Sequence, residues 1–219
     1  MVFDMAGTTV EDCGQVPDAF TAALARHGIE VTPEQVKAVR GSSKRQAILH
    51  LVPTGSQQAR LAEEVYASFR AHLAQRYASE GVRAIPGAEL ALRALRERGV
   101  RVALNTGFDR EITTLLLDAL GWADGMVDAV VCGDDVARGR PAPYLIFRAM
   151  EATGTSSVHR VATVGDTTLD LLAGYHAGVS WNIGVLSGAH DRQALESVPH
   201  THLLLSVAAV TGLWQWPAA

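Results

Sequence analysis

Close to the N-terminus stands the stretch Asp4-Met5-Ala6-Gly7-Thr8-Thr9, directly after the apolar pair Val2-Phe3. The apolar pair is typical of a buried strand, although a parallel strand usually has about five residues. A carboxylate at a strand end, followed by a Gly-Thr turn, places a nucleophile beside backbone N–H groups that can hold a phosphoryl group. An Asp that caps a turn explains the same stretch equally well, so its function depends on the rest of the chain.

Short apolar segments alternate with helical segments from residue 81 onward. We predict strands at 100–104, 129–132, 161–164, 181–185 and 202–205, and helices at 86–98, 110–120, 143–153 and 169–177. Strands that alternate with helices of about 10 to 15 residues indicate βαβ units. The sequence therefore predicts an α/β fold with a doubly wound parallel sheet, a Rossmann-like core.

Residues 15–80 carry helical patterns only, which we predict at 18–27, 32–41, 42–51 and 57–79. The start at Thr32-Pro33-Glu34-Gln35 is typical of a helix with a Thr N-cap, a Pro in the first turn and a capping box completed by Gln35. We expect residues 15–80 to form a helical cap domain. It would be inserted between residues 1–14 and 81–219, which together form the core domain.

The composition excludes several classes of protein. Hydrophobic residues make up 48% of the chain and charged residues 19%, as in a soluble globular protein. We see no apolar run of the roughly 18 residues that a membrane helix needs and no secretory signal. The two cysteines suggest no disulfide framework, so we expect a cytoplasmic protein. The net charge of −4 argues against a nucleic-acid partner.

Three further polar clusters stand at predicted strand ends or just before a helix, where such sheets bind ligands. Thr106 and Gly107 could hold phosphate oxygens, although Thr-Gly is also an ordinary loop start. Arg140, between Gly139 and Pro141, could neutralise a phosphoryl group, although most single arginines are solvated. Asp166 and Asp170 offer hard oxygen ligands that suit Mg²⁺, although Asp170 could instead complement a helix dipole.

In this order, the four clusters resemble the motifs of the haloacid dehalogenase superfamily, over essentially the whole chain. The resemblance implies that the substrate is a small phosphorylated or phosphonate compound. Asp4 would take its phosphoryl group and so become an aspartyl-phosphate. It implies Mg²⁺ bound by Asp4, the Ala6 carbonyl and Asp166, with support from Asp170 and Thr8. The residues implied in phosphate binding are Thr106, Gly107 and Arg140.

Ala6 occupies the position at which phosphatases of the superfamily carry a second Asp that protonates the leaving group. Without this acid, a phosphatase would lose roughly 10²–10⁴-fold in rate. The string Asp-x-Ala-Gly-Thr-Thr resembles instead the phosphonoacetaldehyde hydrolase branch, whose members break a carbon–phosphorus bond. In that branch a cap lysine forms an imine with the substrate aldehyde and accepts electrons as an enamine. The resemblance assigns this role to Lys44, three residues after Gly41.

The residues around Lys44 partly depart from that branch. Arg40 and Arg45 are candidates for contact with the substrate and for lowering the pKa of Lys44. Members of the branch typically carry His at the position of Ala47, Met at that of Arg40 and Tyr at that of Phe108. We therefore expect a different, more anionic substrate, with Phe108 near it. Lys44 could also be a solvated lysine that only steers anions.

Three functions remain open at this point. The favoured one is a hydrolase of carbonyl-bearing phosphonates that works through Lys44. A phosphate monoesterase without the usual acid and a non-catalytic phospho-ligand binder are the alternatives. The resemblance also makes a homodimer through the cap plausible. We expect His200 and His202 to be structural, Cys13 to be a buried small side chain, and Trp214 and Trp216 to anchor the C-terminal tail.

Overall fold

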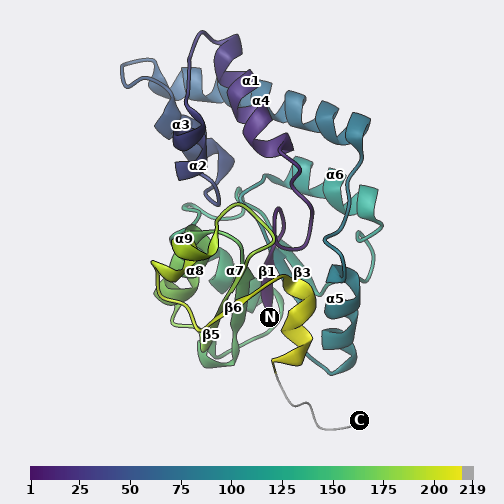
Figure 1. The fold of residues 1–219 in the computed structure, drawn as a ribbon. Helices are drawn as coiled ribbons and strands as arrows, with labels where there is room; N and C mark the ends of the chain where they lie inside the picture. The colour runs from purple at the N-terminus through teal and green to yellow at the C-terminus, as the bar shows by residue number, and fades with distance from the viewer. Residues whose placement is uncertain (214–219) are drawn as a thin grey trace.

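Six parallel strands form one sheet in a computed structural model, which describes residues 1–213 (Figure 1). The strands are β1 (Val2–Asp4), β2 (Ala103–Asn105), β3 (Ala129–Val131), β4 (Ala162–Gly165), β5 (Trp181–Val185) and β6 (His202–Leu204). Their order is β3-β2-β1-β4-β5-β6. The chain moves outward in one direction from β1 to β3 and in the other from β4 to β6. The predicted doubly wound sheet is confirmed, and its order reverses between β1 and β4, where ligands bind in such folds.

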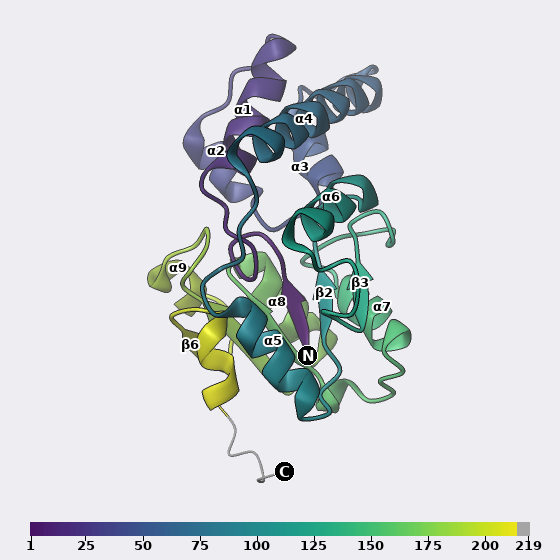
Figure 2. The same ribbon diagram turned by 90° about the vertical axis from the view of Figure 1, so that its right-hand side faces the viewer.

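Helices cover both faces of this sheet (Figure 2). In the core they are α5 (Ala88–Glu97), α6 (Arg110–Leu120), α7 (Tyr144–Ala152), α8 (Thr168–Ala177), α9 (Arg192–Glu196), and the 3-10 helices η1 (Val158–Arg160) and η2 (Val207–Gly212). The residues between β1 and α5 form α1 (Gln15–Arg26), α2 (Pro33–Ala38), α3 (Lys44–Leu51) and α4 (Gln58–Glu80). Helix α5 packs with η2 on one face, and α7 and α8 contact the strands on the other.

Strand β1 shows why the sheet is buried on both sides. Phe3 belongs to a large hydrophobic cluster that includes residues of α5 and η2. Its neighbour Val2 belongs to a second cluster with residues of α7 and α8. Successive side chains of a strand point to opposite faces, so a short apolar strand anchors both layers. Burying a side chain such as Phe3 contributes roughly 1.5–3 kcal/mol.

The helices α1–α4 lie together beyond the carboxyl ends of the strands (Figure 1). Helices α1 and α4 pack through Phe20 and Phe69, whose ring centroids are 4.6 Å apart. The two connections to the core run side by side, since Val10 forms an antiparallel bridge with Ala84. The Ile85 N–H also donates to the Thr9 carbonyl at 3.0 Å. This paired connection fixes where the helices emerge from the sheet.

Several predicted boundaries were wrong by a few residues. Helix α1 begins at Gln15 rather than at residue 18, because Pro17 is tolerated in the first turn, where its missing N–H costs nothing. The capping box between Thr32 and Gln35 is confirmed, but α2 ends at Ala38 rather than at residue 41. The five-residue helix α9 had not been predicted.

Three smaller predictions concern membrane helices, Cys13 and the tryptophans near the C-terminus. None of the helices in residues 1–213 combines the length and the apolar character needed to cross a bilayer. Cys13 is exposed, so the expectation of a buried side chain was wrong. Trp214 and Trp216 lie outside the described residues.

Candidate active site

Polar residues from three neighbouring strands meet at the carboxyl edge of the sheet. In the parallel register, Asp4 at the end of β1 lies beside Asn105 at the end of β2, directly before Thr106. Strand β4 pairs with β1 on the other side and ends one residue before Asp166. The structure therefore brings together side chains that lie about 100 and 160 residues apart in the sequence, as expected for a parallel sheet.

Asp4, Asp166 and Asp170 form a buried carboxylate cluster, with one oxygen of each within 4.8 Å of the others. Burial raises the pKa of Asp166, and the charges of Asp4 and Asp170 raise it further. Burial also raises the pKa of Asp170, although Arg140 acts in the opposite direction. Three hard oxygen donors at this spacing suit a divalent cation such as Mg²⁺, whose charge would offset their repulsion.

The Gly-Thr turn after Asp4 holds Asp166 in place. The Thr8 hydroxyl donates to Asp166 at 3.0 Å, and the backbone N–H of Ala189 donates to its other oxygen at 2.7 Å. Gly7 has a φ of 89°, and a Cβ on it would lie 2.4 Å from that second oxygen. Only glycine permits this approach, which explains why the turn next to Asp4 contains one.

Asp170 combines the two roles considered for it. It forms a capping box with Thr167 at the start of α8, accepting from the Thr167 N–H at 3.0 Å. Its other oxygen pairs with Arg140 Nε at 2.8 Å. The helix cap thus holds the Asp170 carboxylate rigidly against the site, because the same side chain serves both contacts.

Arg140 is buried and lies between two of the carboxylates. Its Nη2 is 2.7 Å from Asp4 Oδ1, and it also donates to the side chain and carbonyl oxygens of Asn105. Burial lowers the pKa of Arg140, but Asp170 and Asp4 outweigh this effect and raise it. A guanidinium bound to two carboxylates fixes their geometry, so Arg140 holds Asp4 in position.

Lys44 reaches the same site from the first turn of α3. Its side chain is buried, with Nζ 4.8 Å from the centre of the Phe108 ring. Its backbone N–H donates to the Gly107 carbonyl at 3.0 Å. A Cβ on Gly107 would lie 2.3 Å from the Ser42 carbonyl, so glycine is required where this loop meets the core. The contact places the amine of α3 beside the strand ends.

Burial lowers the pKa of Lys44 to about 8 from an ordinary value of 10.5. Asp4 and Asp12 raise it, whereas Arg40 and Arg140 lower it. The prediction was that Arg40 and Arg45 both lower the pKa of Lys44. It holds for Arg40 but was wrong for Arg45, whose guanidinium pairs with Glu63 instead. Desolvation of the ammonium is the largest cause, so Lys44 is far closer to a free amine at neutral pH than an exposed lysine is.

Arg45 is the one predicted site residue that points elsewhere. Its guanidinium pairs with Glu63 of α4 and lies over the Tyr66 ring, 4.5 Å from its centre. Arg40, in contrast, does reach the site, where it pairs with Asp12. Because Arg45 is neutralised on the outer side of α3, it is not a candidate for contact with the substrate.

The site encloses a cavity of about 20 Å³, which has room for about one water molecule. The predicted residues that line it are Asp4, Ala6, Arg40, Lys44, Thr106, Gly107, Phe108, Arg140 and Asp166. Thr8 and Asp170 lie just behind it, in contact with Asp166 and Arg140. A ligand with several heavy atoms needs more space than this cavity provides.

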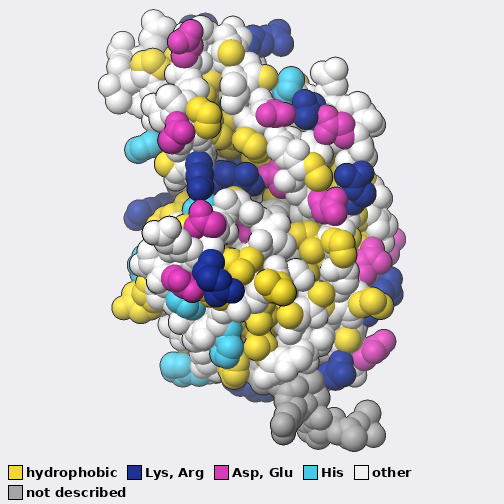
Figure 3. Space-filling view, viewed as in Figure 1, with side chains coloured by type: hydrophobic (Ala, Val, Ile, Leu, Met, Phe, Trp, Pro, Cys, Tyr) yellow, Lys and Arg dark blue, Asp and Glu magenta, His cyan; other side chains and the backbone are white. Residues whose placement is uncertain are grey.

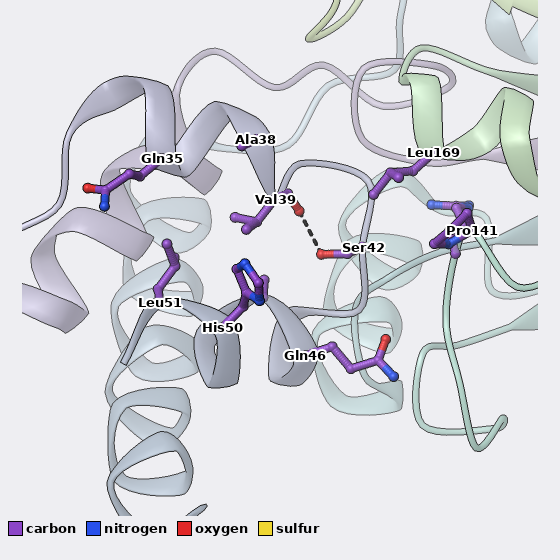
Figure 4. A pocket seen from close by; sticks show the side chains of 11 residues that line it. Gln35, Ala38, Val39, Ser42, Gln46, His50, Leu51, Pro141 and Leu169 are labelled. Atoms are coloured by element: carbon purple, nitrogen blue, oxygen red, sulfur yellow. Dashed lines mark hydrogen bonds between the residues drawn. The ribbon is translucent and has the colours of Figure 1, made fainter. Parts of the chain in front are cut away.

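A larger groove of about 560 Å³ lies next to this cavity, between helices α2 and α3 and the core. Figure 4 shows side chains of both helices on one side of it and Pro141 and Leu169 on the other. Arg140 lines both spaces. Figure 3 shows the hollow between the two parts of the molecule, with Lys and Arg side chains at its edge.

Sequence reasoning missed some residues of the site. Asp12 lines the cavity with a side chain that is 2% exposed, and Asn105 accepts from Arg140. Asn105 could have been found, since it is the last residue of the strand before Thr106. Asp12 carries no local signal, because the linker after β1 is irregular. The histidine pair is structural as expected: His202 stacks on Trp181, and His200 hydrogen-bonds the Val198 carbonyl.

Mg²⁺ should stabilise the protein through the carboxylate cluster. At about 100 times its Kd, a ligand adds about 2.7 kcal/mol, so Tm should rise by about 5 to 10 °C in a chain of this size. Without metal, the raised pKa of Asp166 means that its ionisation opposes folding. Stability of the metal-free protein should therefore fall as pH rises through that pKa.

Differential scanning fluorimetry with EDTA and with excess Mg²⁺ tests this. Asp166→Asn should abolish the Mg²⁺-dependent shift, while Asp118→Asn, an exposed carboxylate on α6, should retain it. An equal shift in wild type and Asp166→Asn would show that the ion binds elsewhere.

The sequence and the fold were compared with those of known proteins. A model of the haloacid dehalogenase-like hydrolase family matches residues 1–183. The chain is 30% identical over 207 residues to phosphonoacetaldehyde hydrolase of Parabacteroides distasonis, covering 87% of this chain and 77% of that one. The crystal structure of a hydrolase from Pseudomonas syringae has a TM-score of 0.87 at 22% identity, covering 100% of this chain and 98% of that one.

A phosphonoacetaldehyde hydrolase-like protein from Oleispira antarctica has a TM-score of 0.84 at 22% identity, covering 97% of this chain and 89% of that one. These two solved structures support the fold, and the family match with the 30% identical relative supports the hydrolase. Together with the buried Asp cluster at the strand ends, they confirm the resemblance predicted from the four motifs. The chain belongs to the haloacid dehalogenase-like hydrolase family.

Proposed function

We propose that the protein is a Mg²⁺-dependent hydrolase that cleaves the carbon–phosphorus bond of a carbonyl-bearing phosphonate. The observation that carries this proposal is the buried amine of Lys44 in the same cavity as Asp4, with a pKa lowered to about 8. An amine near neutrality adds to aldehydes and ketones. The similarity to a relative named phosphonoacetaldehyde hydrolase supports the same reaction.

The proposed roles follow the arrangement of the site. Asp4 attacks phosphorus, and Arg140 orients its carboxylate. The metal would be held by Asp4, the Ala6 carbonyl and Asp166, and it would neutralise the charge of the phosphoryl oxygens. Asp170 and Thr8 support these groups, while Thr106 and the Gly107 amide bind the phosphoryl group. Residues 15–80 act as a cap domain that carries Lys44 to the core formed by 1–14 and 81–219.

The reaction has two linked halves. The Lys44 amine adds to the substrate carbonyl, one proton is taken up from solvent and water leaves, which gives a protonated imine. The Asp4 carboxylate then bonds to phosphorus, and the electron pair of the breaking C–P bond moves into the imine to form an enamine. Water hydrolyses the aspartyl-phosphate to phosphate and Asp4. The enamine takes up a proton at carbon, and its hydrolysis releases the carbonyl product and Lys44.

A phosphatase remains the alternative, and the site offers it little acid catalysis. Ala6 has no acidic side chain. Asp12 also lines the cavity, but its carboxylate accepts from Arg40 and from the backbone N–H groups of Gly14 and Val16. Those contacts leave Asp12 badly placed to protonate a leaving oxygen.

A homodimer through the cap and a cytoplasmic location stay predictions.

Borohydride trapping tests the proposal. With phosphonoacetaldehyde and Mg²⁺, wild type should release phosphate, and borohydride should link the dephosphonated two-carbon product to Lys44 by a stable secondary amine. The chain has only two lysines, so peptide mass spectrometry distinguishes Lys44 from exposed Lys37 and from the N-terminal amine. Phosphate release from generic phosphate esters at a higher rate, without any adduct on Lys44, would support the phosphatase instead.

The pH dependence should report the Lys44 amine. Its free form must add to the carbonyl, so kcat/KM for phosphonoacetaldehyde should rise about tenfold per pH unit and level off above about 8. Arg40→Gln should move this limb to higher pH, because Arg40 lowers the pKa of Lys44 and Asp12 raises it. A limb that stays in place in Arg40→Gln would mean that another group titrates.

A further inference from the structure

A partly buried ion pair joins the core to the cap at the edge of the reaction cavity. Asp12 lies in the connection between β1 and α1, and Arg40 lies in the loop between α2 and α3. The Arg40 guanidinium donates to Asp12 Oδ2. Asp12 Oδ1 accepts from the backbone N–H groups of Gly14 at 3.2 Å and Val16 at 3.3 Å. Both side chains of the pair line the cavity.

The charges in this cavity are already matched. Its charged lining residues are the cations Arg40, Lys44 and Arg140 and the carboxylates Asp4, Asp12 and Asp166. Arg140 pairs with Asp4 and Asp170, and Arg40 pairs with Asp12. Lys44 supplies the reacting amine in the proposed reaction. No cation among these residues is therefore left to pair with a second anionic group of the substrate.

We infer that Asp12 determines specificity by neutralising Arg40, so that the enzyme takes phosphonates whose carbonyl carbon bears an uncharged substituent. A carboxylate at that carbon would enter a buried site close to Asp12 and without a free partner, which is costly. This rests on the proposed function. It reverses the expectation of a more anionic substrate, because Arg40, one of the three departures behind that expectation, is paired with Asp12.

The neighbouring groove fits an uncharged substituent. Its wall beside the Arg40 loop consists of Val39, Ser42, Gln46, Ala47 and His50. Its lining contains no carboxylate, and the guanidinium in it, that of Arg140, is paired with Asp4 and Asp170. Figure 4 shows Gln46 and His50 on α3 beside Ser42, whose hydroxyl donates to the Val39 carbonyl. Apolar walls with a few hydrogen-bonding groups are typical of sites for neutral parts of ligands.

Asp12→Asn tests the inference because it removes the charge and keeps an oxygen for the two backbone N–H groups. Wild type should use phosphonoacetaldehyde in preference to 3-phosphonopyruvate, which bears a carboxylate on the carbonyl carbon. In Asp12→Asn the freed Arg40 can bind that carboxylate, so the ratio of kcat/KM values should shift toward 3-phosphonopyruvate by about 10- to 100-fold. The double variant Asp12→Asn with Arg40→Gln should lose this gain.

Binding gives a measurement that does not depend on turnover. Calorimetry with Mg²⁺ and two non-cleavable ligands, n-propylphosphonate and 3-phosphonopropionate, should show Asp12→Asn tightening 3-phosphonopropionate about tenfold or more relative to n-propylphosphonate. Asp18→Asn, an exposed carboxylate paired with Arg76, is the matched control and should change neither ratio.

The outcomes separate the two proposals. Equal changes for both ligands in Asp12→Asn would make Asp12 a structural residue and overturn the inference. A wild type that prefers 3-phosphonopyruvate would overturn it too. If wild type cleaves neither phosphonate, the proposed function fails, and the binding ratio still decides whether Asp12 masks Arg40.

Discussion

Asp4→Asn should abolish phosphate release, with a loss of at least about 10⁴-fold in kcat. The amide is nearly isosteric with the carboxylate, so it can keep a contact with Arg140, which still pairs with Asp170. It is, however, a very poor nucleophile toward phosphorus. It also withdraws one charge from the carboxylate cluster, so Mg²⁺ binding should weaken as well. Both effects act on the same chemical step.

Phosphate release from phosphonoacetaldehyde and from a generic phosphate ester measures this loss. Both activities should disappear together, since each requires the same nucleophile. Asp118→Asn is the matched surface control, and circular dichroism should give similar spectra for all variants. Beryllofluoride with Mg²⁺ should bind wild type and fail to bind Asp4→Asn. A variant that keeps more than about 1% of wild-type kcat would remove Asp4 from the nucleophile's role.

The order of strands and helices was predictable because its signals are local. Helix α6 has the predicted bounds of Arg110–Leu120, since Asp109 caps its start and Gly121 takes the left-handed conformation at its end. Strand β5 also has its predicted bounds, Trp181–Val185. A cap, a stop residue or an apolar run between polar residues is enough to define such an element.

Strand β2 shows where local signals fail. Residues 100–104 are suited to a strand, but β2 spans Ala103–Asn105 because its central partner offers only Val2–Asp4 for pairing. The backbone N–H of Val102 donates instead to the Asp128 side chain at 2.8 Å. The length of a strand depends on its neighbours in the sheet, and these come from distant parts of the chain.

The residues of the candidate site also divide into those that local sequence patterns predict and those that depend on contacts with distant parts of the chain. Asp4, Thr106 and Asp166 were found because strand ends of a parallel sheet converge, and Arg140 because it stands between Gly139 and Pro141 just before a helix. The side chains of the cap were harder to place. Arg40 and Arg45 flank Lys44 in the sequence and carry the same charge, yet one meets Asp12 and the other meets Glu63 of α4. Which way each points depends on packing between segments, which no motif encodes.

Lys44→Arg should reduce kcat/KM for phosphonoacetaldehyde by about 10³-fold or more, because a guanidinium does not form the imine. Arginine keeps a positive charge and can lie over Phe108 as Lys44 does. The fold and the attraction of anions are therefore retained. Lys37→Arg is the matched control, since Lys37 is the other lysine of the chain and is exposed; it should behave as wild type.

The two substitutions together separate phosphoryl transfer from the electron sink. Asp4→Asn should stop the cleavage of both phosphonate and phosphate ester, whereas Lys44→Arg should stop only the first. Residual hydrolysis of the phosphate ester in Lys44→Arg would show that Asp4 and the metal site are intact. Near-native turnover of phosphonoacetaldehyde by Lys44→Arg would contradict the imine mechanism. In that case the buried amine beside Phe108 would serve to bind anions, and bond cleavage would rest on Asp4 alone.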